Sequence, residues 1–124
     1  MKSDINNRAD IEILVNAFYD KVKTDTVIGY FFTDVAAVNW DKHLPVMYNF
    51  WENIVFNTGT YGGNPMEKHI KLNKLSKLKM EHFQRWTNLF NSTVDSLYEG
   101  TNAELIKQRA LSISTVMQIK ILAK

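Results

Sequence analysis

The spacing of apolar side chains restricts the fold of this chain more than any other feature of its sequence. Between residues 11 and 22 these side chains recur at every third or fourth position, which places them on one face of a helix. Similar spacing is found over about 40–56, over about 78–98 and from Thr101 onwards. Only Ile54-Val55-Phe56 resembles a strand, and no alternating run accompanies it. The sequence therefore predicts an all-α fold. The predicted apolar faces consist of Ile11, Leu14, Val15, Phe18 and Val22; Leu44, Met47, Phe50, Trp51, Ile54 and Val55; Phe83, Trp86 and Phe90; and Ile106, Ala110, Ile113 and Met117.

Pro45 conflicts with the second of these helices. Proline has no N–H to donate within a helix, and its ring collides with the preceding turn. It also disfavours the helical conformation for the residue before it. We therefore expect residues 39–44 to form an irregular segment or a separate first turn.

Polar residues and glycines mark the ends of the other helices. Asp25 and Gly29 are expected to end the first helix, and Gly100 to end the third, because glycine readily adopts the positive φ of a helix terminus. Thr101 followed by Glu104 has the spacing of a capping box, in which each side chain bonds a free N–H of the first turn. The last helix is therefore predicted to begin at Thr101.

Length and composition limit the class of protein. The chain has 124 residues, of which 45% are apolar, so we expect a single domain over 1–124 with a buried core. There is no cysteine, which excludes disulfides, thiolate metal sites and covalent haem attachment. The 15 Lys+Arg and 13 Asp+Glu give a net charge of +2, which provides no footprint for nucleic acid. No apolar segment has the length of a signal sequence or a membrane span, so we expect a soluble, cytoplasmic protein.

A histidine follows a glycine-rich loop in the middle of the chain. Residues 58–65 include three glycines and end in Pro65, which is suited to open a short helix over 66–72. His69 lies on this helix. It is either an ordinary surface histidine or the single protein ligand that a haem iron requires, since the porphyrin supplies the four equatorial nitrogens. A lysine at every third position forms either a solvated face or a cationic rim for haem propionates or an acidic redox partner; these residues are Lys68, Lys71, Lys74 and Lys77.

Two further polar side chains fall on otherwise apolar helix faces. Tyr19 follows Phe18 in the first helix, and Trp86 lies in the stripe of the third. Each is either a core residue or a hydrogen-bond donor directed at a cavity, because a buried Tyr O–H or Trp N–H requires a partner. His43 lies four residues before Met47 and either follows the same stripe or reaches water. The third histidine, His82, is expected to be structural or at the surface.

Three blocks of sequence together resemble the group III truncated haemoglobins of bacteria. The most specific feature is His-Leu-Pro followed by Phe-Trp, and then Gly-Asn-Pro-Met before a histidine. The resemblance extends over most of the chain between residues 11 and 120. The blocks are Ala17-Phe-Tyr-Asp-Lys-Val with Gly29-Tyr-Phe-Phe32; Trp40-Asp-Lys-His-Leu-Pro-Val-Met-Tyr-Asn-Phe-Trp51 continuing through Thr58-Gly-Thr-Tyr-Gly-Gly-Asn-Pro-Met-Glu-Lys-His69; and His82-Phe-Gln-Arg-Trp-Thr-Asn-Leu-Phe90.

The resemblance implies a shortened globin fold, in which helix pairs pack around a non-covalent haem b (iron protoporphyrin IX). It implies that His69 is the iron ligand, and that Tyr19, His43 and Trp86 lie on the opposite, distal side of the haem. Members of this family tolerate a proline just after the distal histidine, so the resemblance also implies that Pro45 is compatible with the second helix. The residues expected to contact the haem are Phe32, Met47, Lys68, His69, Phe83 and Trp86.

The expected function is binding of O2 and other diatomic gases, NO and CO among them, with Tyr and Trp donors stabilising bound O2. The first alternative is an enzyme that detoxifies NO or peroxide with the help of a reductase. The second is a non-enzymatic gas binder, scavenger or sensor. A haem-free helical bundle with an aromatic core is the third. We expect a monomer or a weak dimer.

Overall fold

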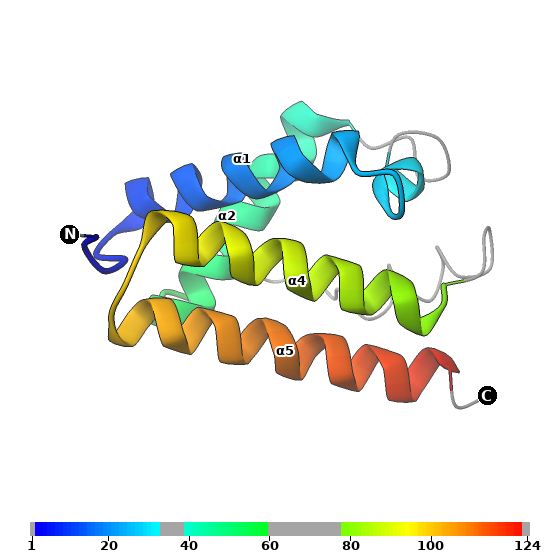
Figure 1. Cartoon of the computed structure of the whole chain (residues 1–124). Helices are drawn as coiled ribbons and strands as arrows, with labels where there is room; N and C mark the ends of the chain where they lie inside the picture. Colours follow the sequence, from blue (N-terminus) through cyan, green and yellow to red (C-terminus); the bar gives the residue numbers. More distant parts are fainter. Residues whose placement is uncertain (1, 33–38, 60–77, 123–124) are drawn as a thin grey trace.

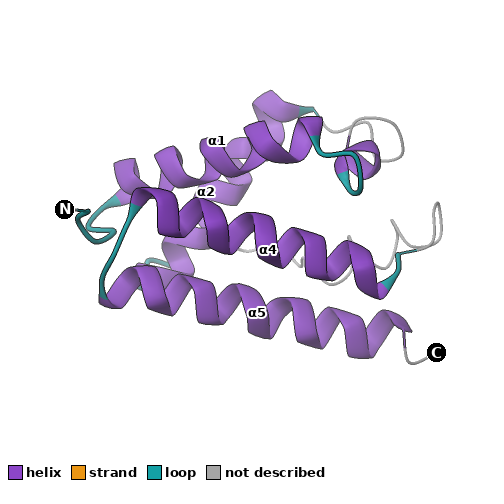
Figure 2. Cartoon of the chain, in the orientation of Figure 1, coloured by secondary structure: helices purple, strands orange, loops and turns teal. Residues whose placement is uncertain are grey.

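The structure of the protein is a computed structural model that describes residues 2–32, 39–59 and 78–122. It contains helices α1 (Arg8–Thr24), α2 (Trp40–Phe56), α4 (Met80–Leu97) and α5 (Thr101–Leu122). Helices α4 and α5 lie side by side and antiparallel, and α2 passes behind α1 and α4 in the view of Figure 1. The described ranges contain no strand (Figure 2), and residues 54–56 are helical. The all-α prediction is confirmed.

Helix α1 supplies six of the buried core residues. The Asn7 side chain caps its first turn by accepting the N–H of Asp10 at 3.0 Å. The predicted apolar face of α1 is fully buried, and α1 packs against α2 and α4. Burial of these side chains from water supplies most of the driving force that holds the four helices together. The fully buried core includes Ile11, Leu14, Val15, Phe18, Val22, Trp51, Phe90, Val94, Ile106 and Ala110.

The prediction of an irregular segment before Pro45 is wrong. Helix α2 begins at Trp40 and continues through Pro45, and the N–H of His43 donates to the carbonyl of Asn39 at 2.8 Å. Pro45 lies only five residues after the first helical residue, so its missing N–H removes one backbone bond, the one to Asp41. The apolar side chains that follow anchor the helix to the core and offset this loss.

Helix α5 begins at Thr101, as predicted, but the group that caps it differs from the prediction. Its first turn is capped by a residue distant in sequence, because the Asp4 carboxylate accepts the N–H groups of Asn102 (2.9 Å) and Ala103 (2.8 Å). Gly100 precedes the helix with φ 146°, and a Cβ there would lie 2.5 Å from Asp4 Cγ. Glycine therefore leaves the space through which Asp4 reaches the helix end. Thr101 is the first helical residue and not its cap.

Helix α2 is apolar but mostly half-buried. Of its 17 residues, only Trp51 is fully buried. Half-buried apolar side chains extend from its first turn to its last, and they pack against the core while remaining partly exposed. A helix with this much partly exposed apolar surface is suited to border a binding site. The residues concerned are Trp40, Leu44, Met47, Phe50, Ile54, Val55 and Phe56.

Candidate functional site

Tyr19 lies at the centre of a group of aromatic rings. Its side chain is only 5% exposed, and its ring contacts those of Phe18 and Phe32 at centroid distances of 5.0 and 5.9 Å. Burial raises the pKa of the Tyr19 hydroxyl well above its usual value of 10. The hydroxyl therefore keeps its proton at any physiological pH and remains able to donate a hydrogen bond.

His43 meets Tyr19 from the first turn of α2. Its Nε2 lies 3.4 Å from the Tyr19 hydroxyl oxygen, and the two ring centroids are 5.3 Å apart. The Nε2 atom either accepts the tyrosine proton or donates its own, depending on the tautomer of the imidazole. The distance is at the long end of hydrogen bonding, so the Tyr19 hydroxyl is only weakly engaged by His43. The structure thus brings together two of the three predicted distal residues.

Trp86 contacts Phe18, the same ring that Tyr19 contacts. Its ring packs edge-to-face on Phe18 at 5.8 Å and is stacked on Phe90 at 5.6 Å, with an interplanar angle of 12°. Trp86 is half-buried, whereas Phe18 and Phe90 are fully buried. The ring is therefore fixed in orientation by the core, while part of it remains accessible.

The predicted cofactor contacts fall on two adjoining clusters of buried residues. Phe83 belongs to a small cluster with Phe31, whereas Met47 is half-buried against the main cluster. Phe32 packs against both clusters and so bridges them. The structure therefore does not place all of these side chains in one cluster, but it does place Phe32, Met47 and Trp86 among half-buried apolar residues.

These residues fit a large, flat and apolar prosthetic group. Half-buried rings and aliphatic chains on α2 and α4 offer surface that a porphyrin would cover, and Tyr19 and His43 supply polar atoms beside them. The predicted iron ligand His69 and the predicted contact Lys68 lie outside the described residues, as do the rest of the lysine run and the predicted helix 66–72. Their roles stay predictions.

His82 has the structural role expected of it. Its Nδ1 accepts the N–H of Lys79 at 2.8 Å at the start of α4, and its ring packs edge-to-face on Phe31 at 4.7 Å. Burial lowers the pKa of His82, an effect that nearby Lys79 reinforces and Glu81 opposes. Its ring is thus used for capping and packing.

Two residues that sequence reasoning did not single out complete the group around Tyr19. The Trp40 ring lies 5.3 Å from that of Tyr19 and 5.8 Å from that of His43, and it is stacked on Phe32 at 6.1 Å. The ammonium group of Lys23 lies over the Trp40 ring, 4.5 Å from its centre. The only signal in the sequence was that Trp40 and His43 are three residues apart, which places them on one face of a helix.

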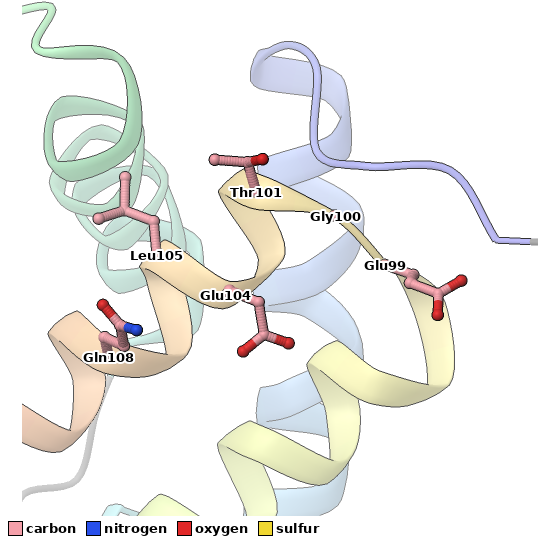
Figure 3. Close-up of a pocket in the computed structure, with 6 residues that line it drawn as sticks. All are labelled: Glu99, Gly100, Thr101, Glu104, Leu105 and Gln108. Carbon is pink, nitrogen blue, oxygen red and sulfur yellow. The ribbon is translucent and has the colours of Figure 1, made fainter.

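A separate surface pocket lies at the connection between α4 and α5 (Figure 3). None of the predicted site residues lines it. Its acidic side chains are Glu99 and Glu104 (Figure 3), and Glu104 is paired with Lys107 at 3.0 Å. It has no feature of a haem site. The pocket is lined by Glu99, Gly100, Thr101, Glu104, Leu105 and Gln108.

The four long helices of the described ranges, with a buried tyrosine beside a histidine and a half-buried aromatic face, are the arrangement of a small protein of globin type. No profile of a protein family matches the chain. The group 3 truncated haemoglobin ctb of Campylobacter jejuni is 30% identical in an alignment of 121 positions that covers 95% of this chain and 93% of that protein. The crystal structure of group III truncated haemoglobin from Campylobacter jejuni is similar with a TM-score of 0.84 and 29% identity, over 98% of this chain and 95% of the other. This chain therefore belongs to the group III truncated haemoglobins.

Membership of this family implies haem binding and supports a role in binding gases. The fold expected from the sequence, a shortened globin, is confirmed by the structural similarity. No helix within the described ranges has both the length and the apolar character needed to cross a membrane.

Proposed function

We propose that this protein binds haem b through His69 and holds a diatomic gas with hydrogen bonds from Tyr19 and Trp86. Ferrous haem, when bound, supplies an iron atom that takes up O2, NO or CO. The observation that carries the proposal is the buried Tyr19 hydroxyl, which keeps its proton and lies beside His43 in an aromatic enclosure. The family to which the chain belongs supports the same cofactor.

The role of Tyr19 follows from its surroundings. A gas ligand that draws electron density from a metal carries partial negative charge, and a fixed donor stabilises that charge. The stabilisation is stronger among apolar rings than in water, because the local dielectric constant is lower. Tyr19 is held by the rings of Phe18, Phe32 and Trp40, so little reorientation is needed for its hydroxyl to donate.

Trp86 provides a second donor in the proposal. Its indole N–H can donate but not accept, so it favours a ligand with negative charge. Stacking on Phe90 fixes the ring plane, and contact with Phe18 connects it to the Tyr19 enclosure. His43 completes the distal side, with its Nε2 atom 3.4 Å from the Tyr19 hydroxyl oxygen.

Haem binding is tested by absorption spectra of the purified protein, reduced and oxidised, with and without CO. We expect a Soret band that shifts on addition of CO. His69→Ala is expected to lose haem, or to retain it only when imidazole is added. The matched control is His82→Gln, which removes a different histidine and should keep the haem. A protein that is colourless and takes up no added haemin would refute the proposal and favour a haem-free helical bundle.

The two proposed donors, Tyr19 and Trp86, also favour a use of the bound gas in redox chemistry. Strong donors polarise O2 and slow its release, which suits a protein that reacts O2 with NO or consumes peroxide. Joining O2 and NO to give nitrate requires one electron, which a cellular reductase would supply. We therefore propose NO or peroxide detoxification. Stopped-flow mixing of the oxygenated protein with NO should give stoichiometric nitrate, with turnover when a reductant is present. A slow reaction of the oxygenated protein with NO, without turnover, would instead favour a non-enzymatic gas binder, scavenger or sensor.

A further inference from the structure

A cation and a tryptophan meet at the outer edge of the Tyr19 enclosure. Lys23 lies in the last turn of α1, and its ammonium group lies 4.5 Å from the centre of the Trp40 ring. Trp40 is the first residue of α2, and the same ring packs against Tyr19, Phe32 and His43. Lys23 itself is exposed and Trp40 is half-buried, whereas Tyr19 is buried. Trp40 therefore lies between an exposed cation and the buried hydroxyl.

The turn that bears Trp40 is weakly fixed to the rest of its helix. The N-cap residue Asn39 makes no side-chain capping bond to any described residue, which leaves the first N–H groups of α2 without that support. Pro45 has no N–H, so the carbonyl of Asp41 lacks its partner within the helix. Two of the usual restraints on the first turn are thus missing. The contacts of Trp40 then become more important for the position of this turn.

We propose that Lys23 and Trp40 are positioning residues that hold the first turn of α2 over Tyr19 and so limit how readily a gas reaches the Tyr19 hydroxyl. The inference rests on the proposed role of Tyr19. A cation over the face of a tryptophan is attracted by the ring electrons, and the attraction holds the ring in place. Displacement of Trp40 exposes the enclosure. The rate of gas binding then scales with the fraction of molecules in which Trp40 is displaced.

The first experiment removes the cation and keeps the length of its side chain. Lys23→Met is compared with Lys21→Met, which removes another exposed lysine of the same helical turn. Rates of CO binding are measured by flash photolysis of the haem-loaded protein. An exposed cation–π contact corresponds to about two- to fivefold in an equilibrium, so we expect CO binding to be about two- to fivefold faster in Lys23→Met than in Lys21→Met. Equal rates in the two variants would overturn the proposal.

The second experiment changes the restraint on the turn in the opposite direction. Pro45→Ala restores the N–H that bonds the carbonyl of Asp41, which stabilises the first turn. We expect CO binding to become about two- to tenfold slower, the equivalent of one net backbone hydrogen bond. Faster binding in Pro45→Ala would contradict the proposal.

A structural measurement separates this proposal from the proposed function. In NMR spectra of the diamagnetic CO form, the Lys23 side-chain protons nearest the ammonium group should be shifted upfield by the Trp40 ring, and Trp40→Leu should abolish the shift. No upfield shift in the unaltered protein would refute the contact itself. If Tyr19→Phe speeds O2 release but Lys23→Met leaves CO binding unchanged, only the inference fails. If Tyr19→Phe has no effect on O2 release, the donor role fails, while the NMR shift still reports on the contact.

Discussion

Replacement of Tyr19 by phenylalanine tests the central element of the proposed function. The change removes one hydroxyl and keeps the ring, which is packed against Phe18, Phe32 and Trp40 at centroid distances of 5.0, 5.9 and 5.3 Å. The Tyr19 side chain is 5% exposed, so the core is expected to remain intact. The loss should then fall on the hydrogen bond that the hydroxyl donates to the gas.

The magnitude follows from the nature of that bond. A hydrogen bond that involves a charged group contributes roughly 1.5–3 kcal/mol, which corresponds to about tenfold to somewhat over a hundredfold in a rate of dissociation. The 3.4 Å separation from His43 Nε2 indicates that little is lost by breaking the existing contact. We therefore expect O2 to dissociate about ten to a hundred times faster from Tyr19→Phe than from the unaltered protein.

The assay is stopped-flow displacement of O2 by CO, followed by absorption. Tyr48→Phe is a matched control, because it removes a tyrosine hydroxyl that donates to Asn16 at an exposed position between α1 and α2. The rate at which O2 dissociates from Tyr48→Phe should equal that of the unaltered protein. Trp86→Phe should also speed dissociation, as it removes the second proposed donor. Unchanged rates in both Tyr19→Phe and Trp86→Phe would refute the assignment of these side chains as donors.

Three further predictions concern stability, measured by denaturant unfolding. Gly100→Ala should destabilise the fold by about 1–3 kcal/mol because the new Cβ would meet Asp4 Cγ at 2.5 Å at a φ of 146°; Gly59→Ala, where nothing lies within 4 Å, should cost less. Asp4→Asn should weaken the α5 cap. Burial acts to raise the pKa of Asp4, but bonds from backbone N–H groups outweigh it and lower the pKa below 3.8. The ionised cap therefore stabilises the fold above about pH 4, and the difference between Asp4→Asn and the unaltered protein should shrink as the pH falls below that value. A stability difference between the two proteins that stays constant as the pH falls would contradict this expectation. Phe90→Ala should cost about 3–5 kcal/mol, since Phe90 is fully buried and stacked on Trp86; a loss below 1 kcal/mol would show that the ring is not a core element.

The helices could be predicted from the sequence because their signals are local. The apolar face of α1 is buried as its spacing predicted, and the third and fourth predicted helices appear as α4 and α5. The expected break before Pro45 was wrong, because the penalty for proline is small near a helix start. The expected cap by Thr101 was wrong because Asp4 occupies that position from the other end of the chain.

The candidate site, like the helices, could be predicted from the sequence only in part. Tyr19, His43 and Trp86 could be suspected as polar groups on apolar helix faces, and the resemblance to truncated haemoglobins gave them roles. Trp40 was not recognised, since a tryptophan at the start of an apolar helix is typical of a core. Its contacts with Tyr19, Lys23 and Phe32 join residues far apart in sequence, and no spacing rule reports such contacts.

The sequence by itself determined the helical class, the faces that are buried and the family, because each depends on residue type and on short-range periodicity. Only the tertiary structure decided which polar atoms meet. The Tyr19 hydroxyl reaches His43 Nε2, Lys23 lies over Trp40, and Asp4 caps α5 because segments separated in sequence pack side by side. Such contacts depend on helix rotation and separation, which the packing of the whole core sets.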